Sequence, residues 1–502
     1  MNDFLAGAGL LIAAGASAAA ILLPAGRPRS LAMLVAIGLF PVLVLGDQWH
    51  THQIVDIRHD EERIVALLAI AAATVGALAF LFRRWPVLLP LAIVAALPFR
   101  VPLHAGGDTA NLLVPLYLVI GAAVLATALR DWSDPRPTHP ARPLAWLLAA
   151  AVVLYALQAL DSDDFSKGLQ NVCFFFVPFT VAYRLLREVE WDRRLLVLTL
   201  WVVGVEATAF VLVGSVEYLS RDLFWNDQVI RSNEFHTYFR VNSIFWDPNV
   251  YGRYLALVIV IATAALLWAR ERRDFALLTA LIGILWVGLA QTYSESSFLA
   301  LLAGLAVLAA LRWNWRWTLG VVAIGAVAIL AIVGATGKLR LNVITSGRAD
   351  LVSGGLDLWT ERPLWGYGSG SFQAAYRDHR ENQDAPVSIS HTEPVTVLAE
   401  QGLVGFALYI ALIAVALWTM TSGIRGPPVG GEEGESENGA SLPRPQDSPS
   451  SPLAARAAVL AAFIALLVHT MAYAGFFEDP ITWVLLAVGA SLATAPAIRD
   501  AP

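Results

Sequence analysis

The chain has 502 residues, of which 57% are hydrophobic and only 15% are charged, and its formal net charge is -6. Soluble globular proteins carry roughly 25% charged residues, so this deficit excludes an ordinary soluble enzyme and indicates an integral membrane protein. No basic domain or stripe suggests nucleic-acid binding, and the single cysteine, Cys173, excludes a disulfide framework within the chain.

Apolar segments that can form transmembrane helices recur along the whole chain. A membrane-crossing helix needs about 20 apolar residues, because lipid cannot satisfy exposed backbone polar groups. The candidate spans lie at residues 4–23, 31–46, 64–82, 86–99, 111–129, 143–160, 169–186, 194–216, 250–269, 275–291, 297–311, 317–335, 403–420, 453–474 and 481–497. Segments 86–99 and 297–311 are short enough to be re-entrant or tilted. We therefore predict an all-α polytopic membrane protein with about 12–15 transmembrane helices and a large extracytoplasmic loop that carries short helices.

Arginine marks alternate loops, which predicts the orientation of the chain. The arginine-bearing loops contain Arg27, Arg29, Arg83, Arg84, Arg130, Arg136, Arg142, Arg187, Arg193, Arg194, Arg270, Arg272, Arg273, Arg312, Arg316, Arg425 and Arg444. The positive-inside rule assigns these loops to the cytoplasm. The two long loops, at about 217–249 and 336–402, then both face the outside, where they can build one site together.

These features divide the chain into four regions. Residues 1–216 hold the N-terminal transmembrane helices, and 217–335 hold the first long external loop and the central helices. Residues 336–402 form the second long external loop, and 403–502 hold the C-terminal helices. Within the last region, residues 426–452 are rich in Gly, Pro, Ser and Glu, which predicts a disordered cytoplasmic linker.

The first long loop ends in the segment FRVNSIFWDPNVYGRYLAL, residues 239–257. Asp247-Pro248-Asn249 is typical of a turn that starts a helix, so a capped polar loop is a sufficient structural reading. Arg240 is more than an ordinary surface charge, because a guanidinium matches the geometry of phosphate oxygens. Arg253 falls just inside the next predicted span, where a charge should face protein or water.

The second long loop carries several polar signals. Ser346-Gly347-Arg348 precedes an amphipathic stretch that favours a surface helix. Gly366, Gly368 and Gly370 alternate in GYGSGSF, a run that bends tightly and can expose backbone N–H groups to an anion. The run is not a P-loop, since no Gly-Lys-Ser/Thr follows it.

His391 stands immediately before a predicted membrane helix. Glu393 and Glu400 follow it and are two helical turns apart on one face. A lone histidine is more often structural, but one at the mouth of a membrane helix beside two glutamates is a candidate for proton transfer.

Other kinds of site lack support in the sequence. No HExxH motif or cysteine pair indicates zinc, and no GxSxG motif indicates a hydrolase. His50, His52 and His59, near Asp56 and Asp60, fit an ordinary solvated loop better than a weak metal site. We therefore predict no metal and no cofactor.

Taken together, these motifs resemble the O-antigen ligase and O-antigen polymerase family of bacterial membrane proteins. The resemblance rests on SGR at 346–348, PLWGYGSGSF at 363–372, His391, LAEQGLVG at 398–405 and RVNSIFWDPN at 240–249. Two positions depart from the family pattern. Glu295 stands where the family often has the arginine of a Ser-Arg pair, and Thr392 stands where asparagine often follows the histidine.

The resemblance implies a glycosyltransferase in the bacterial cytoplasmic membrane, active on its external face in cell-surface polysaccharide synthesis. The donor would be a glycan on undecaprenyl diphosphate, and the acceptor a hydroxyl of a lipid or another glycan. Arg240, Arg348, Asn249, Gly368 and Glu393 would bind substrate. His391 would act on the acceptor hydroxyl, and Glu400 or Glu393 would hold the histidine tautomer.

Two other classes of function remain open at the level of sequence. A transporter of a small anion or of a lipid-linked glycan would carry charged or helix-breaking residues deep in several spans. The sequence offers few of these, chiefly Glu206 and Glu295. A non-catalytic membrane scaffold is the third reading. Ligase and polymerase differ only in the acceptor, which the sequence does not identify.

Overall fold

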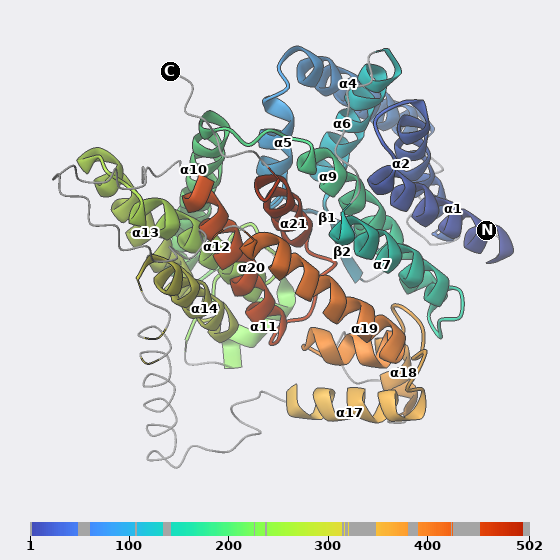
Figure 1. The fold of residues 1–502 in the computed structure, drawn as a ribbon. Helices are drawn as coiled ribbons and strands as arrows, with labels where there is room; N and C mark the ends of the chain where they lie inside the picture. The colour runs from blue at the N-terminus through green and yellow to red at the C-terminus, as the bar shows by residue number, and fades with distance from the viewer. Residues whose placement is uncertain are drawn as a thin grey trace, which may run out of the picture.

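The computed structural model describes residues 3–48, 61–105, 108–133, 142–224, 226–235, 238–313, 316, 320, 348–379, 390–422, 424 and 452–494 (Figure 1). The predicted span 317–335 lies outside the described residues, apart from Gly320. So do His50, His52 and His59, and nearly all of the predicted linker 426–452.

Helices make up almost all of the described structure. Those long and apolar enough to cross a membrane are α1 (Asp3–Leu22), α2 (Arg27–Asp47), α4 (Glu61–Arg84), α6 (Val114–Ser133), the continuous run of α8 (Phe165–Asn171), a π-helix (Val172–Phe176) and α9 (Val177–Arg187), α10 (Arg193–Ser220), α12 (Pro248–Leu267), α13 (Arg272–Thr292), α14 (Glu295–Arg312), α19 (Glu393–Thr421) and α20 (Pro452–Thr470). Two shorter apolar helices, α7 (Pro143–Ala159) and α21 (Pro480–Leu492), accompany these 11 spans. The all-α polytopic class is therefore confirmed.

Two predicted segments differ in the structure. Residues 86–99 yield only α5 (Leu88–Ala96), whose 9 residues are too few to cross a bilayer. The predicted span 111–129 begins later than expected, because β2 (Asp108–Leu112) pairs antiparallel with β1 (Val101–Ala105) before α6 starts. The apolar residues near 111 thus extend a hairpin before they begin a helix.

Close helix packing surrounds α12, which is largely buried against α13, α14 and α20. Small residues allow this approach, as is usual where helices meet in membranes. A Cβ on Gly252 would lie 2.6 Å from the hydroxyl of Ser297, and one on Gly304 would lie 2.6 Å from Val260. These two contacts set the distance between α12 and α14.

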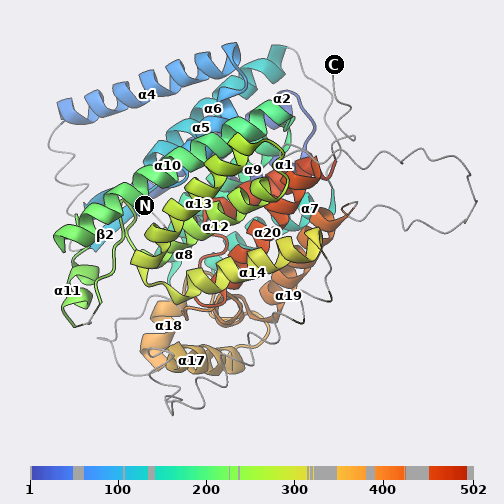
Figure 2. The same cartoon turned by 90° about the vertical axis from the view of Figure 1, so that its left-hand side faces the viewer.

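One end of the bundle gathers the short helices of both long loops. Figures 1 and 2 both place α11 (Asp227–Phe235), α17 (Arg348–Glu361) and α18 (Phe372–His379) at this end. We call it the α17 end. Helices α12, α14, α19 and α21 begin here, and α10, α13 and α20 finish here. The two long loops therefore share one end of the bundle, as expected for a common site.

The opposite end holds a buried ionic cluster. Arg29 pairs with Asp131 and with Glu188, its guanidinium lying 2.5 Å from the latter, and Arg184 lies 2.7 Å from the same Glu188 carboxylate. Arg29 and Asp131 are each 1% exposed. Arg130 also reaches Asp131, at 3.4 Å, so three arginines meet two carboxylates, and the cluster ties α2, α6 and α9 together.

Candidate functional site

The backbone of the first long loop is pinned at two points. The buried carboxylate of Glu217, on α10, accepts a 2.7 Å hydrogen bond from the amide of Ser243. The side chain of Asn233, on α11, accepts from the amide of Arg240 and donates to its carbonyl oxygen, both at 3.0 Å. These contacts fix the place from which the Arg240 side chain extends.

The guanidinium of Arg240 is held by neutral oxygens. Its Nε donates to the carbonyl oxygen of Thr292 at 3.0 Å, and its Nη2 donates to Oδ1 of Asn249 at 3.1 Å. The side chain is half-buried, and none of the ion pairs found among the described residues includes it. Arg240 is therefore an oriented cation whose described partners carry no negative charge.

Asn249 connects this arginine to the bundle. The sequence predicts a helix start at Asp247-Pro248-Asn249, and the structure confirms it: the side chain of Asp247 caps α12 by accepting from the amide of Asn249 at 2.6 Å. The Asn249 side chain also accepts a 2.9 Å hydrogen bond from the hydroxyl of Ser294, which precedes α14. Its Oδ1 thus receives two donors from opposite sides.

The glycine run of the second long loop forms the predicted tight bend. Gly366, Gly368 and Gly370 have φ values of +76°, +94° and +83°. At Gly368 the bend is also crowded, because a Cβ there would lie 2.3 Å from the Cα of Ser162. Only glycine combines this backbone conformation with such a close approach.

Glu400 occupies the inside of this bend. Its carboxylate accepts from the amides of Gly370 at 2.8 Å and Phe372 at 3.1 Å, and its carbonyl oxygen accepts from the amide of Gly368 at 2.8 Å. The amides that we expected to face a substrate anion therefore have partners within the chain. In the structure the glycine run cradles the carboxylate of Glu400, which fastens the loop to α19.

Residues 391–393 sit where α19 meets the loop between α20 and α21. His391 has a φ of +61° and a half-buried side chain. Thr392 donates to the carbonyl oxygen of Met471 at 3.2 Å. The buried carboxylate of Glu393 accepts from the amides of Gly475 at 2.7 Å and Phe476 at 3.0 Å. The contacts described for Glu393 and Glu400 are thus to backbone amides, so both glutamates hold loops.

Tyr473 stands between two histidines. Its ring centroid lies 6.1 Å from that of His391 and 5.9 Å from that of His469. Burial raises the pKa of Tyr473 above its ordinary value, and Asp247 raises it further, so the phenol stays protonated at neutral pH. Through Tyr473 the segment carrying His391 meets the buried end of α20.

His469 completes the connection to Arg240. Its Nε2 lies 3.2 Å from the hydroxyl of Ser296 and 3.4 Å from that of Ser297, and Ser297 lies 2.8 Å from Ser294. Arg240 of the first long loop and His391 of the second are therefore joined through residues that the sequence analysis did not identify. The signal for His469 was present, since a histidine within an apolar span is costly without a polar partner.

A buried arginine, Arg253, lies one helical turn after Asn249 along α12. Arg253 is paired with Asp479, just before α21, at 2.7 Å, and both side chains are at most 5% exposed. Arg100, between α5 and β1, lies within electrostatic range of both. The prediction that Arg253 faces protein and not lipid is confirmed.

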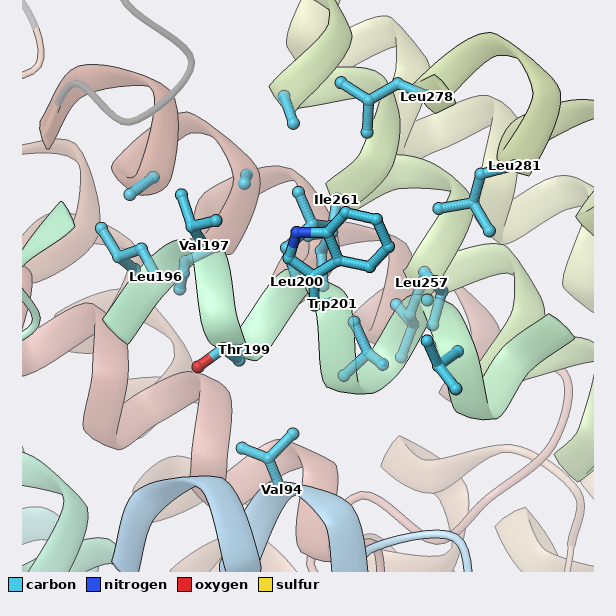
Figure 3. A pocket seen from close by; sticks show the side chains of 18 of the residues that line it. Val94, Leu196, Val197, Thr199, Leu200, Trp201, Leu257, Ile261, Leu278 and Leu281 are labelled. Atoms are coloured by element: carbon cyan, nitrogen blue, oxygen red, sulfur yellow. The ribbon is translucent and has the colours of Figure 1, made fainter. Parts of the chain in front are cut away.

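An apolar cavity of about 640 Å³ lies along α10, α12 and α13 (Figure 3). Its wall includes Tyr254 and Ile481, which lie within two residues of Arg253 and Asp479, and it extends to Trp191, Asp274 and Ala454 near the opposite end of the bundle. Figure 3 shows the side chains that gather around it, among them Val94, Leu200, Trp201, Leu257, Ile261, Leu278 and Leu281. The cavity thus runs along α10, α12 and α13 inside the apolar part of the bundle.

Arg348 begins α17, but its side chain lies outside the described part of the structure. Its approach to Arg240 therefore stays a prediction. Among the described residues, no group of three or more His, Cys, Asp or Glu side chains is arranged to hold a metal ion.

Comparison with known proteins addresses the family. The family model described as O-antigen ligase matches residues 280–410, which are 131 of the 502 residues. This region runs from α13 through α17 and α18 into α19. It contains Ser294, Gly368, His391 and Glu400, whereas Arg240 and His469 lie outside it. No curated protein matches the chain. The chain is thus a polytopic membrane protein that resembles the O-antigen ligase family through residues 280–410, as expected for a membrane glycosyltransferase of the ligase or polymerase type.

Proposed function

We propose that this chain transfers glycan from undecaprenyl diphosphate to an acceptor hydroxyl at the α17 end of the bundle, on the external face of the bacterial cytoplasmic membrane. One observation carries the proposal. Arg240 is oriented by two neutral oxygens, has no ion pair among the described residues, and is joined by a chain of contacts to the segment that carries His391. Such a cation is prepared to receive an anionic ligand.

The reaction follows from these two groups. The oxygen of the acceptor hydroxyl attacks the anomeric carbon of the donor sugar and forms the new glycosidic bond. The bond between that carbon and the diphosphate oxygen breaks, and the lipid diphosphate leaves with the electron pair. His391 accepts the hydroxyl proton, a task that suits a side chain titrating near neutral pH. Attack opposite the leaving group inverts the configuration at the anomeric carbon.

Arg240 stabilises the negative charge that grows on the leaving diphosphate. We assign Arg348 the same task from the opposite loop, because it begins α17 at the same end of the bundle. Two arginine cations can neutralise a diphosphate, so the proposed reaction requires no metal. Asn249 contributes by holding the Arg240 guanidinium in one orientation.

The remaining predicted site residues hold the loops around the site in place. Glu400 and Gly368 hold the glycine bend, and Glu393 holds the loop that carries Tyr473. We therefore assign these three residues positioning roles in the proposed site. The hypothesis that Glu400 or Glu393 sets the tautomer of His391 stays a prediction.

The lipid tail of the donor needs an apolar surface near the diphosphate site. The cavity along α10, α12 and α13 supplies one, since its lining is almost wholly apolar and Tyr254 on its wall directly follows Arg253. Arg253 stands one turn along α12 from Asn249, so the cavity reaches toward the Arg240 site. We assign part of the polyprenyl chain to this cavity.

A membrane assay with a glycan on undecaprenyl diphosphate tests the proposed function. Candidate acceptors are added separately, and the products are resolved by chain length. We expect release of undecaprenyl diphosphate together with a new glycan product, a ladder for a polymerase or one shifted band for a ligase. Export of unchanged donor or of a small anion, without any transferred glycan, would replace this function by transport.

A further inference from the structure

His469 lies within α20, whose other residues are mostly apolar, and its side chain is fully buried. A buried polar side chain in a membrane helix is costly unless hydrogen bonds satisfy it. Its Nε2 approaches two hydroxyls, those of Ser296 at 3.2 Å and Ser297 at 3.4 Å. The imidazole of His469 on α20 is therefore joined to the first turn of the neighbouring helix, α14.

The direction of these hydrogen bonds follows from counting protons. Each serine hydroxyl has one proton to donate. Ser294 donates to Asn249 Oδ1, which has no proton to give on that atom, at 2.9 Å. In its 2.8 Å contact with Ser297, Ser294 must then be the acceptor.

The proton of Ser297 is consequently unavailable to His469. Ser297 either donates to Ser294 or to the carbonyl oxygen of Asn249, which is 3.4 Å away. In both arrangements Ser297 can only accept from the imidazole. The hydroxyl of Ser296 lies 3.2 Å from Nε2 and 3.2 Å from Ser294 and can donate to either, so Nε2 donates to Ser297 in one tautomer of His469 and accepts from Ser296 in the other. In both tautomers the contacts run from His469 through the serines to Asn249.

The far end of this chain is the candidate diphosphate site. Asn249 Oδ1 accepts from Ser294 and from Nη2 of Arg240, so its position depends on both partners. The backbone of Thr292, which accepts from Nε of Arg240, is only two residues from Ser294. We call Ser294, Ser296 and Ser297 the serine relay. The relay contacts the Asn249 side chain directly and begins two residues after Thr292, so it adjoins both groups that accept hydrogen bonds from the Arg240 guanidinium.

We propose that His469 is a positioning residue for the reaction. Its Nε2 atom fixes the hydroxyls of Ser296 and Ser297, and these serines, through Ser294, hold Asn249 and hence the guanidinium of Arg240 in the orientation that receives the diphosphate. This inference rests on the proposed function and adds to it a residue outside the region that matches the family model. His469 acts through Arg240 and touches no reacting atom.

Single substitutions supply the first test. His469→Leu removes the hydrogen-bonding atom, whereas His469→Gln keeps both a donor and an acceptor on a side chain of similar length. We expect His469→Leu and Ser294→Ala each to lower kcat/KM for the lipid-diphosphate donor on the order of 10-fold, and His469→Gln to retain most of it. Ser491→Ala is the matched control, because this buried serine donates to Val189 at the opposite end and should leave kcat/KM unchanged.

A double-mutant cycle separates positioning from structural support. In an Arg240→Ala background, His469→Leu should cause no further loss of kcat/KM, because the group on which it acts is absent. Equal losses in both backgrounds would overturn the inference, as would a loss in the single variant that only follows the amount of folded protein. If His469→Leu does not fold, the same cycle with Ser294→Ala decides between the two roles.

Failure of the two proposals is distinguishable. A wild-type chain that transfers glycan while every relay variant matches it would overturn the role of His469 alone. A wild-type chain that transfers no glycan to any acceptor would overturn the proposed function and the role of His469 with it.

Discussion

The two ends of the bundle use arginine in opposite ways. At the end opposite α17, Arg29 and Arg184 meet the carboxylates of Asp131 and Glu188, so each of these arginines has a carboxylate partner within the protein. At the α17 end, Arg240 is oriented by Thr292 and Asn249 without a carboxylate among its described partners.

This difference separates a structural charge from a functional one. When one partner of a buried ion pair is removed, the other charge stays buried without its compensation. The buried pairs are therefore needed for folding. A cation held by neutral oxygens keeps its charge for a ligand. We therefore expect substitutions at the two ends to affect different measurements.

The largest expected effect is on the rate of glycan transfer and comes from a substitution at the α17 end. His391→Ala should lower the rate of glycan transfer by about 10²–10⁴ while the amount of folded protein holds, because only proton transfer is lost. The rate and the protein level are measured on the same membranes. His379→Ala is the control, since this histidine of α18 pairs with Glu361 and has no part in the proposed reaction. Unchanged transfer in well-folded His391→Ala would remove the histidine from the mechanism.

At the opposite end the effect should fall on stability. Arg29→Leu removes the closer cation of the buried Asp131 and leaves it, among the described ion pairs, only the 3.4 Å contact with Arg130. Loss of one partner from a buried pair costs about 3–5 kcal/mol by analogy with other buried pairs. We expect a lower unfolding temperature in detergent and reduced protein level, with normal transfer per folded molecule. Unaltered unfolding, or a loss of transfer in fully folded protein, would break the distinction between the two ends.

The glycine bend offers a smaller effect at the α17 end. Gly368→Ala forces a Cβ against Ser162 at a positive φ, which strains the loop by about 1–3 kcal/mol or more. We expect a lower unfolding temperature and reduced transfer together, because the bend positions the second loop. Gly283→Ala is the matched control, since no atom lies within 4 Å of the added Cβ. Equal behaviour of the two variants would contradict the positioning role.

The smallest effect on the protein comes from probes of orientation. Ser353→Cys on α17 and Ser133→Cys on α6 replace exposed serines at opposite ends of the bundle, and we expect both variants to stay active. An impermeant thiol reagent added to intact cells should label position 353 and not position 133. The native Cys173 is buried and serves as background. The reverse pattern would place the site on the cytoplasmic face.

Hydropathy predicted most of the helices because each span is a local property of the chain. It failed at 86–99, where only the nine residues of α5 are helical, and at the start of 111–129, where the second strand of the hairpin ends. Local signals also predicted the cap at Asp247 and the bend at Gly366–Gly370. The cap and the bend are local features of the sequence. The hairpin differs, because each strand needs the other as its partner.

The joining of the site could not be predicted in the same way. Glu400 lies on the same helix as Glu393, yet each carboxylate is used by a different loop. His469 is 172 residues from Ser297 in sequence and meets it only because α20 packs against α14. Sequence patterns identified Arg240 and His391 as candidates, but tertiary packing decides which groups orient them.

The central claim is that Arg240 is held for a ligand and Arg29 for the fold. It is tested most directly by measuring donor kcat/KM and unfolding temperature on the same preparations of Arg240→Lys and Arg29→Lys. Lysine keeps the charge but loses the planar fork. We predict that Arg240→Lys loses roughly 10²-fold in kcat/KM at an unchanged unfolding temperature, whereas Arg29→Lys unfolds at a lower temperature with normal kcat/KM per folded molecule. Arg231→Lys, at an exposed position of α11, should change neither quantity. Wild-type kcat/KM in Arg240→Lys, or a loss that only followed its unfolding, would contradict the claim.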